Sequence, residues 1–457
     1  MRTVQLEDLP NIIDEIEPVD EPLFNEKFAL QFVETVFILL DEYISDNPKA
    51  VSEPDFYDEC KDVIEELIVI PWEHEIRLFG DIEDELDMLI DESIELFFHS
   101  FFTSRSFENT FTNSLSEEYC DKIENKLIYL RGKPQPAQRT QEWYTFRHKL
   151  ITASNAYKAF ESQSVKNQLI YEKCQPLKEI KEDEPVTMVN INTTLHWGQK
   201  YEPLSVMIYE YLYNTTVEDF GCIQHDTYSF LGASPDGINV DPVSERYGRM
   251  LEIKNIVNRE INGIPKKEYW IQMQLQMEVC DLDECDFLET KFVEYESEAD
   301  YWLDEIEEHK KGVIMYFATS EGKPLYVYKP LDIVCPEDIT EWEEKTMATS
   351  SLTWIKNYYW KLEKMSCVLV SRNKEWFEQN IHELADIWDI ILKERETGFQ
   401  HRAPNKRIKK DKNNVNELQE KESQGCLLHL DKDSKIHIQE NNKPKLNDNS
   451  IQRFFRI

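Results

Sequence analysis

The stretch from residue 231 to residue 255, LGASPDGINVDPVSERYGRMLEIKN, constrains the fold of this chain more than any other feature. Its Ser-Pro-Asp-Gly segment predicts a turn, because Pro235 fixes φ and Gly237 supplies a permissive backbone. Its last six residues, Met-Leu-Glu-Ile-Lys-Asn, alternate between apolar and polar side chains and predict a short strand. Side chains two positions apart on a strand share a face, so Glu252 and Lys254 are expected to project together.

This arrangement sets an acid and an amine on one strand face, with Asp236 held at the neighbouring turn. Two carboxylates that converge with a backbone carbonyl, here that of Ile253, are donors suited to Mg²⁺ or Mn²⁺. A lysine beside such a metal orients a water or stabilises a developing oxyanion. Asp236, Glu252 and Lys254 are therefore candidate catalytic residues for phosphodiester hydrolysis. The alternative is structural, because Pro-Asp-Gly is a common turn and Glu-x-Lys is usually a solvated pair.

Three further blocks flank this stretch in a fixed order. Upstream lie Gln-Glu-Trp-Tyr-Thr-Phe-Arg-His-Lys-Leu-Ile-Thr-Ala-Ser at 141–154 and Trp-Gly-Gln-Lys-Tyr-Glu-Pro at 197–203, and downstream lies Trp-Ile-Gln-Met-Gln-Leu-Gln-Met at 270–277. Together, the four blocks resemble the lambda exonuclease or YqaJ-type viral recombinase family of PD-(D/E)XK nucleases. The resemblance covers roughly residues 139–295.

The resemblance implies an α/β (α+β) fold, with a restriction-endonuclease-like core built on a central mixed sheet. It implies a Mg²⁺-dependent DNA exonuclease that degrades duplex DNA from 5′ ends during viral recombination, replication or repair. One alternative keeps the fold but makes the protein a structure-specific or flap endonuclease. Another is a catalytically inactive scaffold, which the intact Asp236, Glu252 and Lys254 disfavour.

The resemblance also implies roles for four further residues. Glu202 corresponds to an active-site glutamate near the metal, although an acid in the first turn of a helix is commonly explained by the helix dipole. Gln274 best matches a glutamine that supports the active site. Arg147 and Ser154 correspond to a pocket for a 5′-phosphate, which agrees with the anion site that helix N-termini and a guanidinium form. The structural alternative is a surface cation and a helix-start serine.

The charge of the chain is unevenly distributed. The formal net charge is −38, but residues 1–130 alone hold 8 Lys and Arg against 34 Asp and Glu, which is 8 − 34 = −26. A basic groove can exist within an acidic protein, so the net charge does not exclude linear duplex DNA as a partner. The acidic region is interpreted as solvated helix faces, with a docking surface for a basic partner or a DNA mimic as the alternatives.

Nine scattered cysteines without a CxxC pair favour reduced thiols in an intracellular protein. No apolar run reaches the length of a membrane span, and the N-terminus lacks an apolar signal core, so neither a membrane partner nor secretion is expected. The resemblance implies a host nucleus or a cytoplasmic viral replication site, and a possible single-strand annealing partner.

The pattern of apolar residues and turn signals predicts four parts. Helices are expected throughout the first part, and at 140–149, 153–160, 197–214 and 266–281 in the second. His225 is interpreted as a residue of a strand hairpin rather than a ligand. The parts are an acidic helical domain at 1–132, a nuclease core at 133–330, a helical C-terminal section at 331–399 and a disordered tail at 400–457.

In the C-terminal section, long helices are expected over about 336–365 and 371–396, the second with Ser371 as its N-cap. The polar tail ends in Asp448-Asn-Ser-Ile-Gln-Arg-Phe-Phe, which resembles a sliding-clamp binding box. Its apolar anchors would be Ile451, Phe454 and Phe455, although Asp448 replaces the usual glutamine. The basic segment 405–412 is interpreted as an import signal or a phosphate contact.

Overall fold

The computed structural model describes residues 26–79, 83–102, 104–108, 115–177, 190–350 and 352–404. All described residues belong to one compact unit. The clamp-box residues Ile451, Phe454 and Phe455 and the basic segment 405–412 lie outside the described residues.

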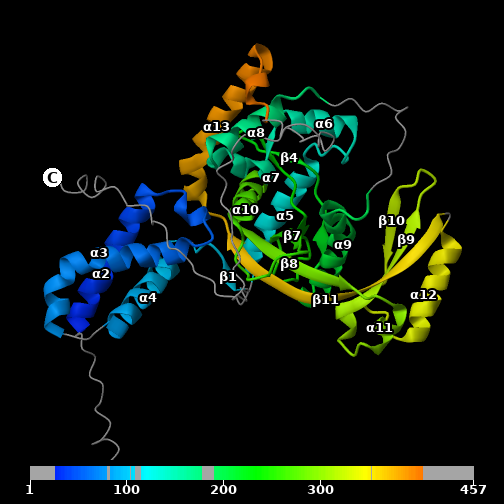
Figure 1. Cartoon of the computed structure of the whole chain (residues 1–457), viewed down its shortest axis with the longest axis horizontal. Helices are drawn as coiled ribbons and strands as arrows, with labels where there is room; N and C mark the ends of the chain where they lie inside the picture. The colour runs from blue at the N-terminus through cyan, green and yellow to red at the C-terminus, as the bar shows by residue number, and fades with distance from the viewer. Residues whose placement is uncertain are drawn as a thin grey trace, which may run out of the picture. The chain divides into compact units, whose positions relative to one another are not determined.

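A mixed sheet forms the centre of the described structure (Figure 1). Its strands follow the order β10-β9-β11-β8-β7-β6-β3, and β1 pairs with β11. Strands β7 and β8 run parallel, whereas the other pairs are antiparallel. The expected α/β fold with a central mixed sheet is confirmed. The strands are β1 (Phe107–Glu108), β3 (Val217–Glu218), β6 (Gly237–Asn239), β7 (Met250–Asn255), β8 (Glu284–Glu294), β9 (Lys311–Ala318), β10 (Pro324–Tyr328) and β11 (Thr353–Ser371).

Different helices cover the two faces of β7. Leu251 and Ile253 pack in one apolar cluster with Tyr209 of α9 (Thr194–Tyr213). On the other face, Glu252 accepts hydrogen bonds from α10 (Lys267–Cys280). The alternation of the strand therefore places its acidic side chain between the sheet and α10.

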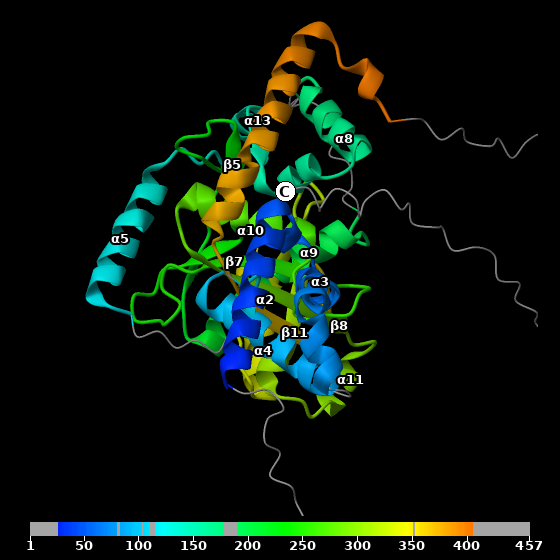
Figure 2. The same ribbon diagram turned by 90° about the vertical axis from the view of Figure 1, so that its left-hand side faces the viewer.

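A small second sheet contacts α10. It has the order β2-β5-β4, with β2 parallel and β4 antiparallel to β5. Around it, α13 contacts α8, and the two helices lie side by side in Figures 1 and 2. The elements are β2 (Ile151–Thr152), β4 (Ile223–Gln224), β5 (Leu231–Ala233), α6 (Gln141–His148), α7 (Ala153–Ala156), η3 (Tyr157–Phe160), α8 (Gln163–Cys174) and α13 (Lys374–Thr397).

The described part of the acidic region is helical apart from β1, as expected. In α2, Phe32, Val36 and Leu40 recur every four residues and are fully buried, so one helix face supplies the core. The hydroxyl of Ser116 caps α5 by accepting from the Tyr119 N–H at 3.2 Å. The helices are α2 (Glu26–Asp46), η2 (Ala50–Ser52), α3 (Phe56–Phe79), α4 (Glu83–Ser100) and α5 (Glu117–Gly132).

The expected helix over 336–365 is wrong in its second half. Helix α12 (Pro336–Thr349) ends before Ser350, and β11 then runs to Ser371. This strand pairs with β9 along its first half and with β8 along its second half, which makes it a central strand. The apolar pattern of these residues fits either a helix or a strand. Their β-branched and aromatic side chains suit a strand, and pairing with two neighbouring strands stabilises that structure. The short elements nearby are α11 (Glu298–Leu303), η4 (Glu308–Lys310) and η5 (Gln400–Arg402).

The proposed N-cap of the last helix is also wrong by two residues. Asn373, not Ser371, caps α13, because its Oδ1 accepts from the Trp376 N–H at 2.8 Å. The carbonyl of Ser371 instead accepts from Gln274. Gly398 follows the last residue of the helix, as expected.

Candidate active site

The turn that carries Asp236 is fastened to the strand that carries Glu252. Strand β6 begins directly after Asp236 and pairs with β7, with Gly237 opposite Leu251. The Oδ2 atom of Asp236 accepts from the backbone N–H of Ile253 at 2.8 Å. Gly237 is needed here for close packing, since a Cβ atom on it would lie 2.1 Å from a side-chain carbon of Val217.

Glu252 is fully buried and receives three side-chain donors. The Nε2 atoms of Gln272 and Gln276 each donate to its carboxylate at 2.7 Å. The ammonium of Lys254 donates to the same oxygen as Gln272. These donors occupy about three of the four lone-pair directions of the carboxylate, which leaves one for a further ligand.

Lys254 lies between the carboxylates and an aromatic ring. Its Nζ atom is 4.9 Å from the centre of the Tyr269 ring. Burial by itself lowers the pKa of Lys254, but Glu252 and Asp236 outweigh it and raise the pKa above its usual value. Lys254 is therefore a cation at neutral pH and serves as a donor rather than as a proton acceptor.

Glu202, on α9, belongs to the same electrostatic group. Its side chain keeps solvent-exposed surface. The pKa of Glu202 is nevertheless raised, first by desolvation and then by the charge of Glu252, while Lys254 lowers it. Glu202 also contributes to raising the pKa of Asp236. The structure therefore brings Glu202, Asp236, Glu252 and Lys254 together.

The electrostatics of this group fit a divalent cation. The pKa of Asp236 lies well above its usual value because the carboxyl is buried and faces Glu252 and Glu202, and Lys254 offsets this only in part. A cation bound between the carboxylates would relieve their repulsion. Within the described ranges, no three His, Cys, Asp or Glu side chains are already arranged as a complete metal cage.

Gln274 does not lie in this site, contrary to expectation. Its Nε2 donates to the carbonyl of Ser371 at 3.0 Å, and its Oε1 accepts from the Asn373 N–H at 2.7 Å. Residues two apart on a helix point to different sides, whereas residues four apart share a face. The spacing of Gln272 and Gln276 is thus the sequence signal that identifies the pair on Glu252.

Arg147 and Ser154 lie on either side of Thr152. The Nη2 atom of Arg147 is 3.5 Å from the Thr152 hydroxyl, which is 3.5 Å from the Ser154 hydroxyl. The guanidinium also lies over the ring of Trp143, 4.6 Å from its centre. No described carboxylate forms an ion pair with Arg147. The structure therefore brings the two predicted residues into one polar row.

Two cations that the sequence did not single out lie beside Arg147. Lys173 of α8 donates to the Arg147 carbonyl at 3.3 Å, and Arg395 of α13 donates to the His148 carbonyl at 2.7 Å. Burial, together with Arg147 and Arg395, lowers the pKa of Lys173 to about 8. These groups hold the end of α6 and make its surroundings electropositive. No local motif marks either residue, because only the folded chain brings α8 and α13 to α6.

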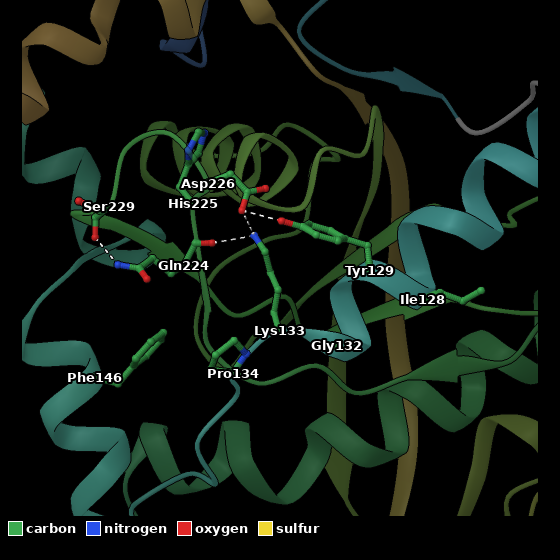
Figure 3. A pocket seen from close by; sticks show the side chains of 10 residues that line it. All are labelled: Ile128, Tyr129, Gly132, Lys133, Pro134, Phe146, Gln224, His225, Asp226 and Ser229. Atoms are coloured by element: carbon green, nitrogen blue, oxygen red, sulfur yellow. Dashed lines mark hydrogen bonds and ion pairs between the residues drawn. The ribbon is translucent and has the colours of Figure 1, made fainter.

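A pocket of about 490 Å³ lies apart from the carboxylates (Figure 3). Within it, Asp226 pairs with Lys133 at 2.8 Å and accepts from the Tyr129 hydroxyl at 2.9 Å. The Nδ1 atom of His225 accepts from the N–H groups of Thr227 and Tyr228, each at 3.0 Å. The interpretation of His225 as a hairpin residue is confirmed. The lining residues are Ile128, Tyr129, Gly132, Lys133, Pro134, Phe146, Gln224, His225, Asp226 and Ser229.

Comparison with known families supports the resemblance noted in the sequence. Residues 142–283 match the model of the YqaJ-like viral recombinase domain. This range contains Arg147, Glu202, Asp236 and Glu252, and it ends one residue before β8 begins. The resemblance to the YqaJ-type family is therefore confirmed for this part of the chain.

One curated relative is an uncharacterized protein of Acanthamoeba polyphaga mimivirus. It is 29% identical over 317 residues, which are 60% of this chain and 56% of that protein. The chain thus spans little more than half the length of this relative.

None of the helices in the described ranges is both long and apolar enough to span a bilayer.

Two solved structures cover the same share of the chain. The crystal structure of LHK-Exo in complex with dAMP is 20% identical and covers 57% of this chain and 95% of its own, with a TM-score of 0.30. The crystal structure of an alkaline exonuclease, LHK-Exo, from Laribacter hongkongensis is 19% identical with the same coverage and a TM-score of 0.31.

Proposed function

We propose that this protein is a divalent-metal-dependent deoxyribonuclease that removes nucleotides from the 5′ ends of linear duplex DNA. One observation carries the proposal: Asp236, Glu252 and Lys254 converge at one end of β7, with Glu202 beside them. These are the groups that hydrolysis of a phosphodiester requires. They lie in the range that matches the YqaJ-like viral recombinase domain.

In this proposal, the carboxylates of Asp236 and Glu252 and the carbonyl of Ile253 would hold Mg²⁺ or Mn²⁺, with Glu202 close to it. The metal, when bound, supplies a Lewis acid and makes a water more acidic. Lys254 donates to the attacking water or to the charge that develops on the phosphate. Gln272 and Gln276 fix the orientation of Glu252, so that its remaining lone pair points in one direction.

The direction of cleavage rests on Arg147 and Ser154. A guanidinium without a carboxylate partner among the described residues, in a row with two hydroxyls, is suited to a terminal phosphate. Lys173 and Arg395 add positive charge near the same helix end. A 5′-phosphate held there would select a chain end over an internal bond.

The direct experiment is digestion of end-labelled linear duplex and closed circular DNA by the purified full chain. Each substrate is treated with Mg²⁺ or with EDTA, and the linear duplex carries either a 5′-phosphate or a 5′-hydroxyl. The proposal predicts Mg²⁺-dependent release of mononucleotides from the linear duplex, faster with the phosphate. Circles cut as fast as linear DNA would favour the structure-specific endonuclease, and no cleavage of any substrate would contradict nuclease activity.

The partners other than DNA belong to the same proposal. Ile451, Phe454 and Phe455 would anchor the chain to a sliding clamp, and a single-strand annealing protein would take up the strand that cleavage leaves. A peptide spanning residues 445–457 should bind the cognate clamp with a Kd in the micromolar range, about −8 kcal/mol, in calorimetric titration. Equal binding by a peptide with Phe454 and Phe455 replaced by Ala would exclude the clamp box.

A further inference from the structure

Arg105 is a buried cation in the segment between α4 and α5. Only 1% of the residue is exposed. Its Nη2 donates to the carbonyl of Ser52 at 3.1 Å and to the carbonyl of Pro265, while Nε and Nη1 have no hydrogen-bond partner among the described residues. No described carboxylate forms an ion pair with it, and burial lowers its pKa to about 10.

The contacts of Arg105 join the acidic region to the start of α10. In the acidic region, the backbone N–H of Arg105 donates to the Tyr57 hydroxyl at 2.8 Å. At the start of α10, its carbonyl accepts from Trp270 Nε1 at 2.9 Å, and its guanidinium lies 6.0 Å from the centre of the Trp270 ring. Arg105 therefore contacts both the residue before the N-cap of α10 and a residue in its first turn.

The N-terminus of α10 depends on such outside contacts. Its N-cap residue, Lys266, makes no side-chain capping bond. In the second and third turns of α10, Gln272 and Gln276 donate to Glu252. A shift or rotation at the start of a helix moves side chains along its length together, because the backbone hydrogen bonds make it rigid. Contacts at Pro265 and Trp270 thus bear on the orientation of Glu252.

Burial of the Arg105 guanidinium costs free energy, and no described residue offsets this cost with a hydrogen bond to its Nε or Nη1 atom. An apolar side chain of similar length would avoid the desolvation of the charge. What Arg105 provides beyond volume is a directed donor to the carbonyl of Pro265, in addition to the contact with Ser52. Strand β1 starts two residues later and pairs with β11, so the segment is fixed to the sheet as well.

We propose that Arg105 is a positioning residue of the nuclease site, which holds the start of α10 so that Gln272 and Gln276 orient Glu252. The inference rests on the proposed function for its catalytic consequence. It gives the acidic region 1–132 a role inside the catalytic unit, in addition to any docking surface on its exterior. The described contacts of Arg105 are with Tyr57, Ser52, Pro265 and Trp270, and not with the proposed metal ligands.

Two substitutions in the full-length protein test this inference. Arg105→Met keeps the length and apolar stem but removes every donor, and Arg105→Lys keeps the charge and one donor group. Arg131→Met is the matched control, because Arg131 is exposed, lies in the same acidic region and pairs with Glu218. Three quantities are measured: amide hydrogen exchange along the chain, the single-turnover cleavage rate with Mg²⁺ at saturating DNA, and DNA affinity.

For Arg105→Met, exchange should become about tenfold faster in residues 267–276 and remain unchanged in β9. The single-turnover rate should fall about tenfold while the Kd for DNA stays within twofold of the wild type. For Arg105→Lys, the exchange rate in α10 and the cleavage rate should lie between those of Arg105→Met and the wild type. Arg131→Met should match the wild type in all three quantities. Exchange that rises uniformly along the chain, or an unchanged rate with unchanged exchange in α10, would overturn the inference.

The exchange measurement separates this inference from the proposed function. If the wild type cleaves no DNA, the proposed function fails. Faster exchange confined to α10 in Arg105→Met would still support the positioning of α10 by Arg105, and unchanged exchange would contradict it.

Discussion

Gln276 donates from Nε2 to Glu252 Oε2 at 2.7 Å, so α10 fixes one oxygen of the fully buried carboxylate on β7. Gln272, one turn earlier, fixes the other oxygen in the same way. Two amide donors on one helix face thus set the orientation of the carboxylate. The Nε2 atom of Gln276 also donates to the carbonyl of Ser234 at 3.2 Å, whereas its buried Oε1 atom has no partner among the described residues.

Replacing Gln276 by Leu should lower the cleavage rate of the folded protein. The variant removes the donor to Glu252 and to the carbonyl of Ser234, so the free energy of unfolding should also fall by about 1–3 kcal/mol. Loss of a group that orients a metal ligand typically costs about 10- to 100-fold in activity or metal affinity. Single-turnover cleavage and thermal unfolding measure the two effects.

Gln274→Leu is the matched control on the opposite helix face. It breaks two hydrogen bonds to the backbone at Ser371 and Asn373 and leaves a buried N–H unpaired. The free energy of unfolding should fall by about 1–3 kcal/mol. The cleavage rate of the folded fraction should remain that of the wild type. Equal effects of Gln274→Leu and Gln276→Leu on the rate would contradict the assignment.

Lys254→Ala should slow the chemical step without weakening metal binding. Lys254 donates to Glu252 and stays protonated at neutral pH, so its proposed role is to stabilise charge rather than to bind the metal. Removal of one such group typically costs about 10²- to 10³-fold in rate. Lys254→Arg should not restore the full rate, since a planar guanidinium differs in shape from an ammonium. A large shift in the Mg²⁺ midpoint with an unchanged saturating rate would contradict this role.

The site was predictable where it depends on local pattern. The alternation of Met250–Asn255 and the Pro-Asp-Gly turn predict Asp236, Glu252 and Lys254 as site residues. Local pattern gave a wrong prediction for the first part of residues 353–371, which was expected to be helical. Pairing with β8 and β9, which the local sequence does not show, makes this segment a strand.

Residues that act through distant contacts left no local signal. Arg105 and Arg395 reach backbone carbonyls on elements far away in the sequence, and a lone arginine has no pattern that reveals such a contact. The prediction of Gln274 rested on the family resemblance and is wrong, because this side chain bonds to the backbone at Ser371 and Asn373. The i, i+4 spacing of Gln272 and Gln276 is the sequence pattern that places both on one helix face.

The raised pKa of Asp236 predicts how stability depends on pH and metal. A carboxyl whose pKa is higher in the folded state stabilises the fold below its unfolded pKa, near 3.9, and this contribution is lost as pH rises through the folded pKa. In EDTA, Asp236→Asn should therefore melt at a higher temperature than the wild type at pH 8, with a smaller difference at pH 5. Asparagine keeps the acceptor for the Ile253 N–H.

With Mg²⁺ at pH 8, the wild type should instead melt at a higher temperature than Asp236→Asn. A ligand at 100 times its Kd stabilises the state that binds it by about 2.7 kcal/mol, and the wild type retains the full donor set. Differential scanning fluorimetry across pH, with and without Mg²⁺, makes the measurement. Equal stabilisation of both proteins by Mg²⁺ would exclude Asp236 as a ligand.

Arg147→Ala should remove the preference for a phosphorylated 5′ end. The guanidinium next to Thr152 and Ser154 is the proposed phosphate contact, whereas the carboxylate site lies on other elements. Cleavage of a 5′-hydroxyl duplex should therefore change little, and the advantage of the 5′-phosphate should disappear. Competition between the two labelled duplexes in one reaction measures the ratio directly. Equal losses on both substrates would indicate a general role in folding or catalysis.

The most direct test of the metal-nuclease account is cleavage by Asp236→Ala and Glu252→Ala, measured beside DNA binding by the same preparations. Both variants lose a proposed metal ligand, while the phosphate contacts of Arg147 remain. Single-turnover digestion of a 5′-phosphorylated duplex with Mg²⁺ should show no detectable cleavage by either variant, with the Kd for DNA close to that of the wild type. A rate within about tenfold of the wild type in either variant would contradict the account, because loss of a ligand at the reacting metal costs far more than that.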